Sequence, residues 1–129
     1  MRRPLYFKFL TGLSLLFLVR PVGPPARAWA HAYPAFSVPT DGSTLTVAPN
    51  EVKIRFTEGV ELEFSRIDVK NAGGETVSQG KVRRIAPDTL AVALKPLVPG
   101  PYVIEWQVLS VDTHITDGTL RFTIRADKK

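Results

Sequence analysis

The stretch YVIEWQV, residues 102–108, alternates large apolar side chains with smaller or polar ones. Its large apolar residues are Tyr102, Ile104, Trp106 and Val108. They would share one face of an extended chain, because successive side chains of a strand point to opposite faces. The same two-residue period returns in four other stretches, residues 52–56, 67–70, 90–94 and 120–124. These stretches predict half-buried β-strands, with residues 120–124 pairing with residues 102–108.

Turn-forming residues separate the predicted strands at regular intervals. They are Asp41-Gly42, Glu58-Gly59, Gly73-Gly74, Pro87-Asp88 and Pro99-Gly100-Pro101. Gly and Pro supply the positive or fixed φ values that turns require. Since no helical spacing occurs between them, the sequence predicts an all-β sandwich of about seven to nine strands.

Aromatic residues in these stretches are expected to fill the core, because burial of an aromatic ring contributes strongly to a small domain. The expected core aromatics are Phe56, Phe64, Trp106 and Phe122. Residues 97–102 resemble the corner before a late strand of immunoglobulin-like domains, in which a Tyr hydroxyl bonds back to the chain. This resemblance predicts a structural role for Tyr102.

Residues 1–30 have the three parts of an export signal. Arg2, Arg3 and Lys8 precede an apolar stretch, residues 9–19, and Ala28-Trp29-Ala30 forms an A-x-A cleavage site. The apolar stretch has about half of the ~20 residues that a membrane-spanning helix needs. We therefore predict a cleaved signal peptide over residues 1–30, rather than a membrane anchor. The exported domain, residues 31–129, would begin at His31 and would not insert into the membrane.

The charge of the chain belongs to this leader. The leader carries five of the 17 Lys and Arg residues and none of the 12 Asp and Glu residues, so 12 basic residues balance 12 acidic ones in the remainder. A neutral domain lacks the basic surface that attracts nucleic acid. The chain has no Cys, although small exported domains often rely on disulfides. We expect a monomer that binds no nucleic acid and folds by packing, either alone or with help from a metal.

The two histidines, His31 and His114, are the main candidates for metal binding. A His at a new N-terminus offers its ring Nδ1 and the freed α-amino group, whose ordinary pKa of about 7.7–8 allows deprotonation near neutral pH. Asp112 and His114 follow the long predicted strand, and residues i and i+2 of an extended chain point the same way. Three nitrogens and one carboxylate suit Cu(II), whereas Cu(I) prefers sulfur ligands. We predict His31, Asp112 and His114 as ligands of one Cu(II) ion.

These residues bring out a family resemblance over nearly all of residues 31–125. His31, the turn at residues 39–42, the strand IRFTE at residues 54–58 and the motif SVDTH at residues 110–114 resemble the periplasmic copper resistance proteins of the CopC family. The resemblance implies an immunoglobulin-like or cupredoxin-like Greek-key β-sandwich or barrel. It also implies that an N-terminal His and a late Asp-x-His bind Cu(II), and a role in copper resistance, buffering or delivery rather than catalysis.

The resemblance has consequences for several other residues. It places Glu58 beside the copper, where it would orient the site; the alternative is a solvated acid at a strand end. The Met-rich Cu(I) loop of two-site members is absent, which indicates the Cu(II)-only type.

Some relatives are fused to a multi-helix membrane domain, so a separate CopD-like membrane protein is a candidate partner. Pro34 predicts a first strand that starts late or lies at a sheet edge, and Tyr33 either shields the copper or is an ordinary surface or core residue.

Two other functions remain open at this point. A terminal His with a second His also holds copper in the histidine-brace oxygenases, although Asp112 would occupy a position that such enzymes tend to leave for oxygen or substrate. A metal-free immunoglobulin-like binding or adhesion module is the other alternative, because a fold does not determine a function.

Overall fold

The computed structural model describes residue 23 and residues 31–127, so the predicted signal peptide lies outside the described residues except for Gly23. Residues 31–127 form eight strands and contain no helix, and accordingly no membrane-spanning helix occurs in this part of the chain. The strands are β1 (Pro34–Val38), β2 (Ser43–Leu45), β3 (Glu51–Phe56), β4 (Val60–Asn71), β5 (Ser78–Ala86), β6 (Thr89–Leu94), β7 (Gly100–Ser110) and β8 (Ile115–Ile124). The predicted all-β fold is confirmed.

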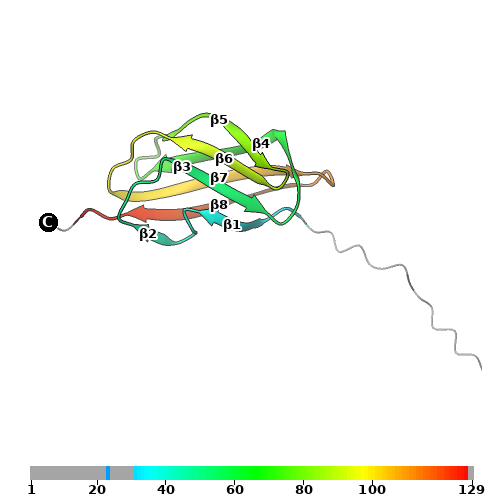
Figure 1. The fold of residues 1–129 in the computed structure, drawn as a ribbon, viewed down its shortest axis with the longest axis horizontal. Helices are drawn as coiled ribbons and strands as arrows, with labels where there is room; N and C mark the ends of the chain where they lie inside the picture. The colour runs from blue at the N-terminus through cyan, green and yellow to red at the C-terminus, as the bar shows by residue number, and fades with distance from the viewer. Residues whose placement is uncertain (1–22, 24–30, 128–129) are drawn as a thin grey trace, which may run out of the picture.

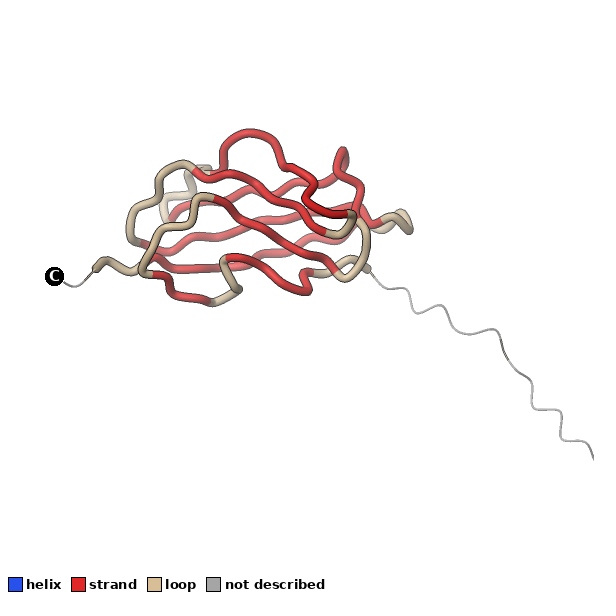
Figure 2. The backbone as a smooth tube through the Cα atoms, viewed as in Figure 1, coloured by secondary structure: helices blue, strands red, loops and turns tan. Residues whose placement is uncertain are grey.

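The strands form two four-stranded sheets, in the orders β1-β3-β6-β5 and β2-β8-β7-β4 (Figure 1). Within the sheets β2 and β8 pair in parallel, whereas the other pairs are antiparallel. Consecutive strands such as β3 and β4 lie in different sheets, as in a Greek-key sandwich. The long strands run along the sandwich, and the loops gather at its two ends (Figure 2).

Strand β7 supplies the centre of the core. Its apolar residues Tyr102, Ile104, Trp106 and Val108 are buried, as their spacing predicts. Tyr102 pairs with Phe122 and Ile104 with Leu120, so the predicted pairing with β8 is also confirmed. The Trp106 ring packs edge-on against Phe56 of the other sheet at 5.6 Å between centroids. Each large apolar side chain buried in this way stabilises the fold by about 1.5–3 kcal/mol.

Gly118 of β8 leaves room for the Trp106 indole. A Cβ atom at position 118 would lie 2.8 Å from Cζ2 of Trp106, closer than packed carbon atoms approach. Glycine is therefore required where β8 passes beneath this ring.

The prediction for Phe64 was wrong. Its side chain is 65% exposed. The register of β4 against β7 shifts between Glu61 and Arg66, and such a bulge interrupts the alternation of inward and outward side chains. Phe64 lies in this irregular segment and faces solvent.

Strands β2 and β5 were not predicted. β5 is an edge strand with mainly exposed residues, and Gly80 within it has a positive φ of 74°. Its sequence therefore lacks an apolar alternation. β1 does lie at a sheet edge, as Pro34 predicts, and its register against β3 shifts between Pro34 and Phe36.

The corner before β7 has the predicted Tyr geometry. The Tyr102 hydroxyl donates a hydrogen bond to the Val98 carbonyl at 2.6 Å and accepts one from the Val98 amide at 3.1 Å. Its ring stacks on Phe122 with centroids 5.1 Å apart. The side chain thus ties the loop before β7 to the pair β7–β8.

Replacement of Tyr102 by Phe keeps the stacked ring and removes both hydrogen bonds. We expect Tyr102→Phe to lower the free energy of unfolding by about 1–3 kcal/mol, the cost of leaving such polar groups without their partner. Urea unfolding measures this change in the free energy of unfolding. Tyr33→Phe is the control, because the Tyr33 hydroxyl has no hydrogen-bond partner among the described residues. Equal stability of the two variants would contradict a structural role for the Tyr102 hydroxyl.

Candidate metal centre

Three segments meet at one end of the sandwich. They are residues 31–33, the β3–β4 loop at residues 57–59 and the β7–β8 turn at residues 111–114. The Thr57 amide donates to the Tyr33 carbonyl at 2.8 Å, and the Val111 amide donates to the Gly59 carbonyl at 3.0 Å. The β3–β4 loop therefore joins the first described residues to the β7–β8 turn.

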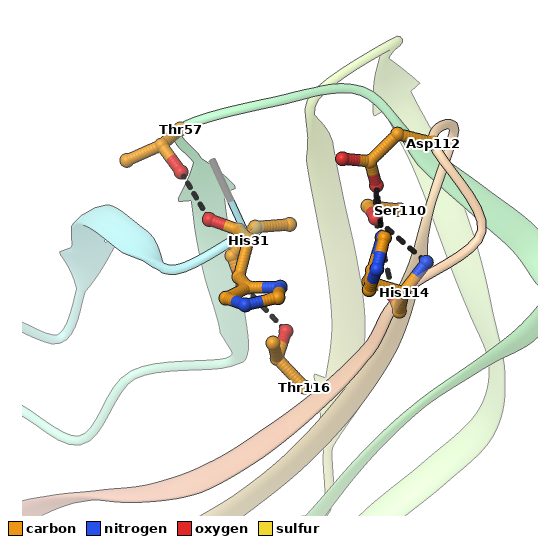
Figure 3. A network of polar contacts seen from close by, with 7 residues as sticks. His31, Thr57, Ser110, Asp112, His114 and Thr116 are labelled. Carbon is orange, nitrogen blue, oxygen red and sulfur yellow. Dashed lines mark hydrogen bonds and ion pairs between the residues drawn. The ribbon is translucent and has the colours of Figure 1, made fainter. Parts of the chain in front are cut away.

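Two threonine hydroxyls fasten residues 31–33 to the sandwich (Figure 3). Thr116 of β8 donates to the carbonyl of the fully buried Ala32 at 2.6 Å. Thr57 donates to the His31 carbonyl at 3.2 Å and accepts from the Tyr33 amide at 3.1 Å. We call these two residues the threonine clasp. It holds the backbone on both sides of Ala32, and so places the backbone from which the His31 side chain extends.

The Asp112-Thr113-His114 triplet is not extended, contrary to the prediction. It lies in the tight turn between β7 and β8, closed by a hydrogen bond from the Ser110 amide to the His114 carbonyl at 2.9 Å. Thr113 has a φ of 72°, the left-handed conformation that reverses the chain. Asp112 and His114 still meet, because a turn rather than a strand brings their side chains together.

The three predicted ligands form a row of contacts. The ring centroids of His31 and His114 lie 5.0 Å apart, and Nδ1 of His114 lies 3.4 Å from Oδ1 of Asp112. Figure 3 shows the Asp112 carboxylate turned toward Ser110 and His114. Among the described residues, no three His, Cys, Asp or Glu side chains converge closely enough to hold a metal ion by themselves. The structure thus brings the two imidazoles together and leaves Asp112 beside His114.

The donor atoms of His31 fit a metal ion. Nδ1 of His31 is buried and has no hydrogen-bond partner among the described residues. A buried polar atom without a partner is unfavourable, and a bound cation would offset that cost. This nitrogen is also the ring atom that can chelate a metal together with the α-amino group of the same residue. Cleavage before His31 would convert its backbone amide into that amine.

The Asp112 carboxylate is stabilised in its ionised form. The hydrogen bond from Ser110 is the largest influence and lowers the pKa of Asp112; partial loss of hydration opposes it, and contacts with His114 lower the pKa further. Asp112 is therefore anionic at neutral pH. A negative charge beside the His114 imidazole favours binding of a cation.

Two further predicted residues lie close to this row. Glu58 is half-buried in the β3–β4 loop, between Thr57 and Gly59, and has no ion pair or hydrogen bond with the described residues. Its orienting role stays a prediction. Tyr33 is 52% exposed and its ring lies edge-on to the His31 ring, with centroids 6.3 Å apart. Tyr33 is therefore a surface residue in contact with a candidate ligand.

Sequence reasoning gave no role to Thr57, Thr116 or Ser110. Ser110 lies within the SVDTH motif beside the predicted ligands Asp112 and His114, and this position was a signal that could have identified it. The two threonines contact residues far away in the chain, and no local pattern marks such pairs.

Residues 35–125 match the CopC domain family. The chain belongs to the CopC family. The matched range includes Asp112 and His114, and His31 lies just before it. CopC proteins are copper-binding resistance proteins, typically periplasmic, and not enzymes. Family membership therefore decides against the oxygenase alternative and against a metal-free adhesion module.

Several curated proteins are similar to this chain. Protein YobA of Escherichia coli K12 is 34% identical over 100 residues, which cover 75% of this chain and 81% of YobA. Copper resistance protein C of Xanthomonas campestris pv. juglandis is 32% identical over 114 residues, which cover 78% of this chain and 84% of that protein. Copper transport protein CutJ of Bacillus subtilis 168 is 37% identical over 115 residues, which cover 87% of this chain but 21% of CutJ.

Solved structures share the fold. CopC from Methylosinus trichosporium OB3b is 29% identical with a TM-score of 0.68, over 77% of this chain and 98% of that one. PcoC from Escherichia coli, described as a methionine-rich copper resistance protein, is 27% identical with a TM-score of 0.66. The match covers 74% of this chain and 100% of PcoC. The present chain contains a single methionine, Met1.

The threonine clasp can be tested on the copper-free protein. Thr116→Val keeps the shape of the side chain and removes the hydroxyl that bonds to Ala32, so we expect a loss of about 1–3 kcal/mol in urea unfolding. Thr119→Val is the control, since Thr119 is exposed on the same strand and its hydroxyl has no partner among the described residues. The clasp would be refuted if the two variants unfolded alike.

The Ser110 hydroxyl should control the acidity of Asp112. Its hydrogen bond favours the carboxylate, so Ser110→Ala should raise the pKa of Asp112 toward its ordinary value of about 3.9. Because the folded pKa is lowered, this group stabilises the fold above that ordinary value, and the contribution is lost as the pH falls through the folded pKa. NMR titration of the Asp112 carboxyl in copper-free protein measures the shift. An unchanged pKa in Ser110→Ala would show that another group holds the carboxylate ionised.

Proposed function

We propose that the protein is an exported Cu(II)-binding protein that takes part in copper resistance by buffering or delivering the ion. The proposed ligands are the α-amino group and imidazole of His31, the imidazole of His114 and the carboxylate of Asp112. In this proposal residues 1–30 are a signal peptide, and its removal creates the amino-terminal ligand. The exported domain would act in the periplasm as a monomer.

The observation that carries the proposal is the approach of the two imidazoles. His31 and His114 are the only histidines in the sequence, they lie far apart along the chain, and their ring centroids are 5.0 Å apart. A chain with two histidines has few other ways to present several neutral nitrogens to one ion. The threonine clasp on one side and the β7–β8 turn on the other hold the two rings in place before any metal binds.

The donor set favours Cu(II) over other ions. Amine and imidazole nitrogens with one carboxylate suit the tetragonal coordination of Cu(II), and the Irving–Williams order gives this ion the highest affinity among the common divalent metals. The chain has no Cys, and its single Met lies in the proposed signal peptide. Sulfur ligands for Cu(I) are therefore lacking in the exported domain.

A delivery role would require a partner. CutJ is named a copper transport protein, and the region similar to this chain makes up 21% of it. This relation supports a part in copper transport, and the partner that we propose is a separate membrane protein of the CopD kind. In this proposal Glu58, in the β3–β4 loop, orients the copper site.

A Cu(II) titration tests the amino-terminal ligand. Protein starting at His31 is compared with a variant that has one extra Ala before His31, and with His114→Ala. The extra residue keeps both imidazoles but replaces the amine by an amide, so we expect both variants to bind at least about tenfold more weakly, a loss of 1.4 kcal/mol or more. Paramagnetic resonance should report a nitrogen-rich tetragonal site in the unaltered protein alone.

The melting temperatures of the same three proteins with and without Cu(II) are a second test of the site. An ion that binds only the folded state at 1,000 times its Kd adds about 4 kcal/mol to the free energy of unfolding. The unaltered protein should therefore melt at a clearly higher temperature with Cu(II), and the two variants should gain less. Equal weak binding and equal melting of all three proteins would overturn the proposed function.

A further inference from the structure

Tyr33 is an exposed aromatic residue that contacts a proposed copper ligand. Its ring is 52% exposed and meets the His31 ring at 86°, with centroids 6.3 Å apart. Edge-to-face packing of this kind is a favoured arrangement of aromatic rings. Tyr33 takes no part in the core, so its contact with His31 is not a by-product of core packing.

The backbone of Tyr33 is held in place beside His31. The Tyr33 amide donates to the Thr57 hydroxyl at 3.1 Å, and the Tyr33 carbonyl accepts from the Thr57 amide at 2.8 Å. Pro34 follows directly and begins β1, and a residue before proline is restricted to extended conformations. The Tyr33 backbone, from which the ring extends toward His31, is therefore held by two hydrogen bonds to Thr57 and by the restriction before Pro34.

The His31 imidazole contacts two rings. It meets His114 at 5.0 Å and Tyr33 at 6.3 Å, and its Nδ1 has almost no surface accessible to solvent. The Tyr33 ring restricts rotation of the imidazole and covers part of it. A competing chelator must displace His31 from the metal before it can remove the metal, and both effects oppose that displacement.

We propose that Tyr33 is a positioning residue that keeps the His31 imidazole facing His114 and slows the release of bound copper to competing ligands. This inference rests on the proposed copper site. The Tyr33 hydroxyl has no partner among the described residues, so the aromatic ring alone carries the effect. Phe should replace Tyr33 without loss, and Ala should not.

Transfer of Cu(II) to excess EDTA, followed by stopped-flow absorbance, tests the proposal. The protein is purified after export, and its first residue is established by mass spectrometry. Tyr33→Ala should release copper about two- to tenfold faster, the effect of losing one aromatic pair. Tyr33→Phe should release it at the unaltered rate.

Phe36→Ala is the matched control. Phe36 is 53% exposed and lies three residues further along the same segment, but it pairs with Arg55 on β3. Its loss should leave the release rate unchanged. Melting temperatures of the copper-free variants establish that all are folded.

NMR of the copper-free protein gives a readout independent of the metal. The ring protons of His31 should shift in Tyr33→Ala, and should stay within a small change in Phe36→Ala. If the unaltered protein binds copper but Tyr33→Ala releases it at the same rate, Tyr33 has no such role and the copper site stands. If the unaltered protein binds no copper, both proposals fall together.

Discussion

The hydrogen bonds from two threonine hydroxyls to residues 31–33 are the constraint on which the candidate metal centre depends. The first residues of a domain are poorly ordered unless something ties them down. Here Thr57 binds the backbone on both sides of Ala32, and Thr116 binds Ala32 itself, whose side chain is fully buried. Without these bonds His31 would move freely, and its imidazole would have no fixed relation to His114.

The clasp also uses both layers of the sandwich. Thr57 follows β3 of one sheet, and Thr116 belongs to β8 of the other. The segment that carries His31 therefore bridges the two sheets at the end where the β7–β8 turn presents Asp112 and His114. Ser110, at the end of β7, lowers the pKa of the Asp112 carboxyl through its hydrogen bond and contacts the backbone of His114. Rigid strands thus position candidate ligands that lie outside the strands.

The sequence predicted those parts of the fold that leave a local pattern. The two-residue period of β7 and β8 and the corner at Tyr102 were predicted correctly, because burial of alternate side chains and a specific turn both act over short distances. The polar edge strand β5 and the short β2 were missed, and Phe64 was assigned to the core because a bulge cannot be recognised from apolar spacing.

The site shows the same limit. His31, Asp112 and His114 could be proposed from the sequence because few side chains in the chain are of kinds that bind metals, and cleavage before His31 would add an amine ligand. Their geometry could not be predicted: the Asp-x-His triplet forms a turn with a positive φ at Thr113 instead of an extended segment. The threonine clasp was also missed, since hydrogen bonds between residues distant in sequence leave no periodic signal.

The most direct test of this account is a crystal structure of the copper-loaded protein, starting at His31, with anomalous diffraction recorded at the copper edge. We expect one copper ion between the imidazoles of His31 and His114, bound also by the amino group of His31, with the clasp bonds to Thr57 and Thr116 unchanged. Copper bound elsewhere, or at His114 without His31, would contradict it.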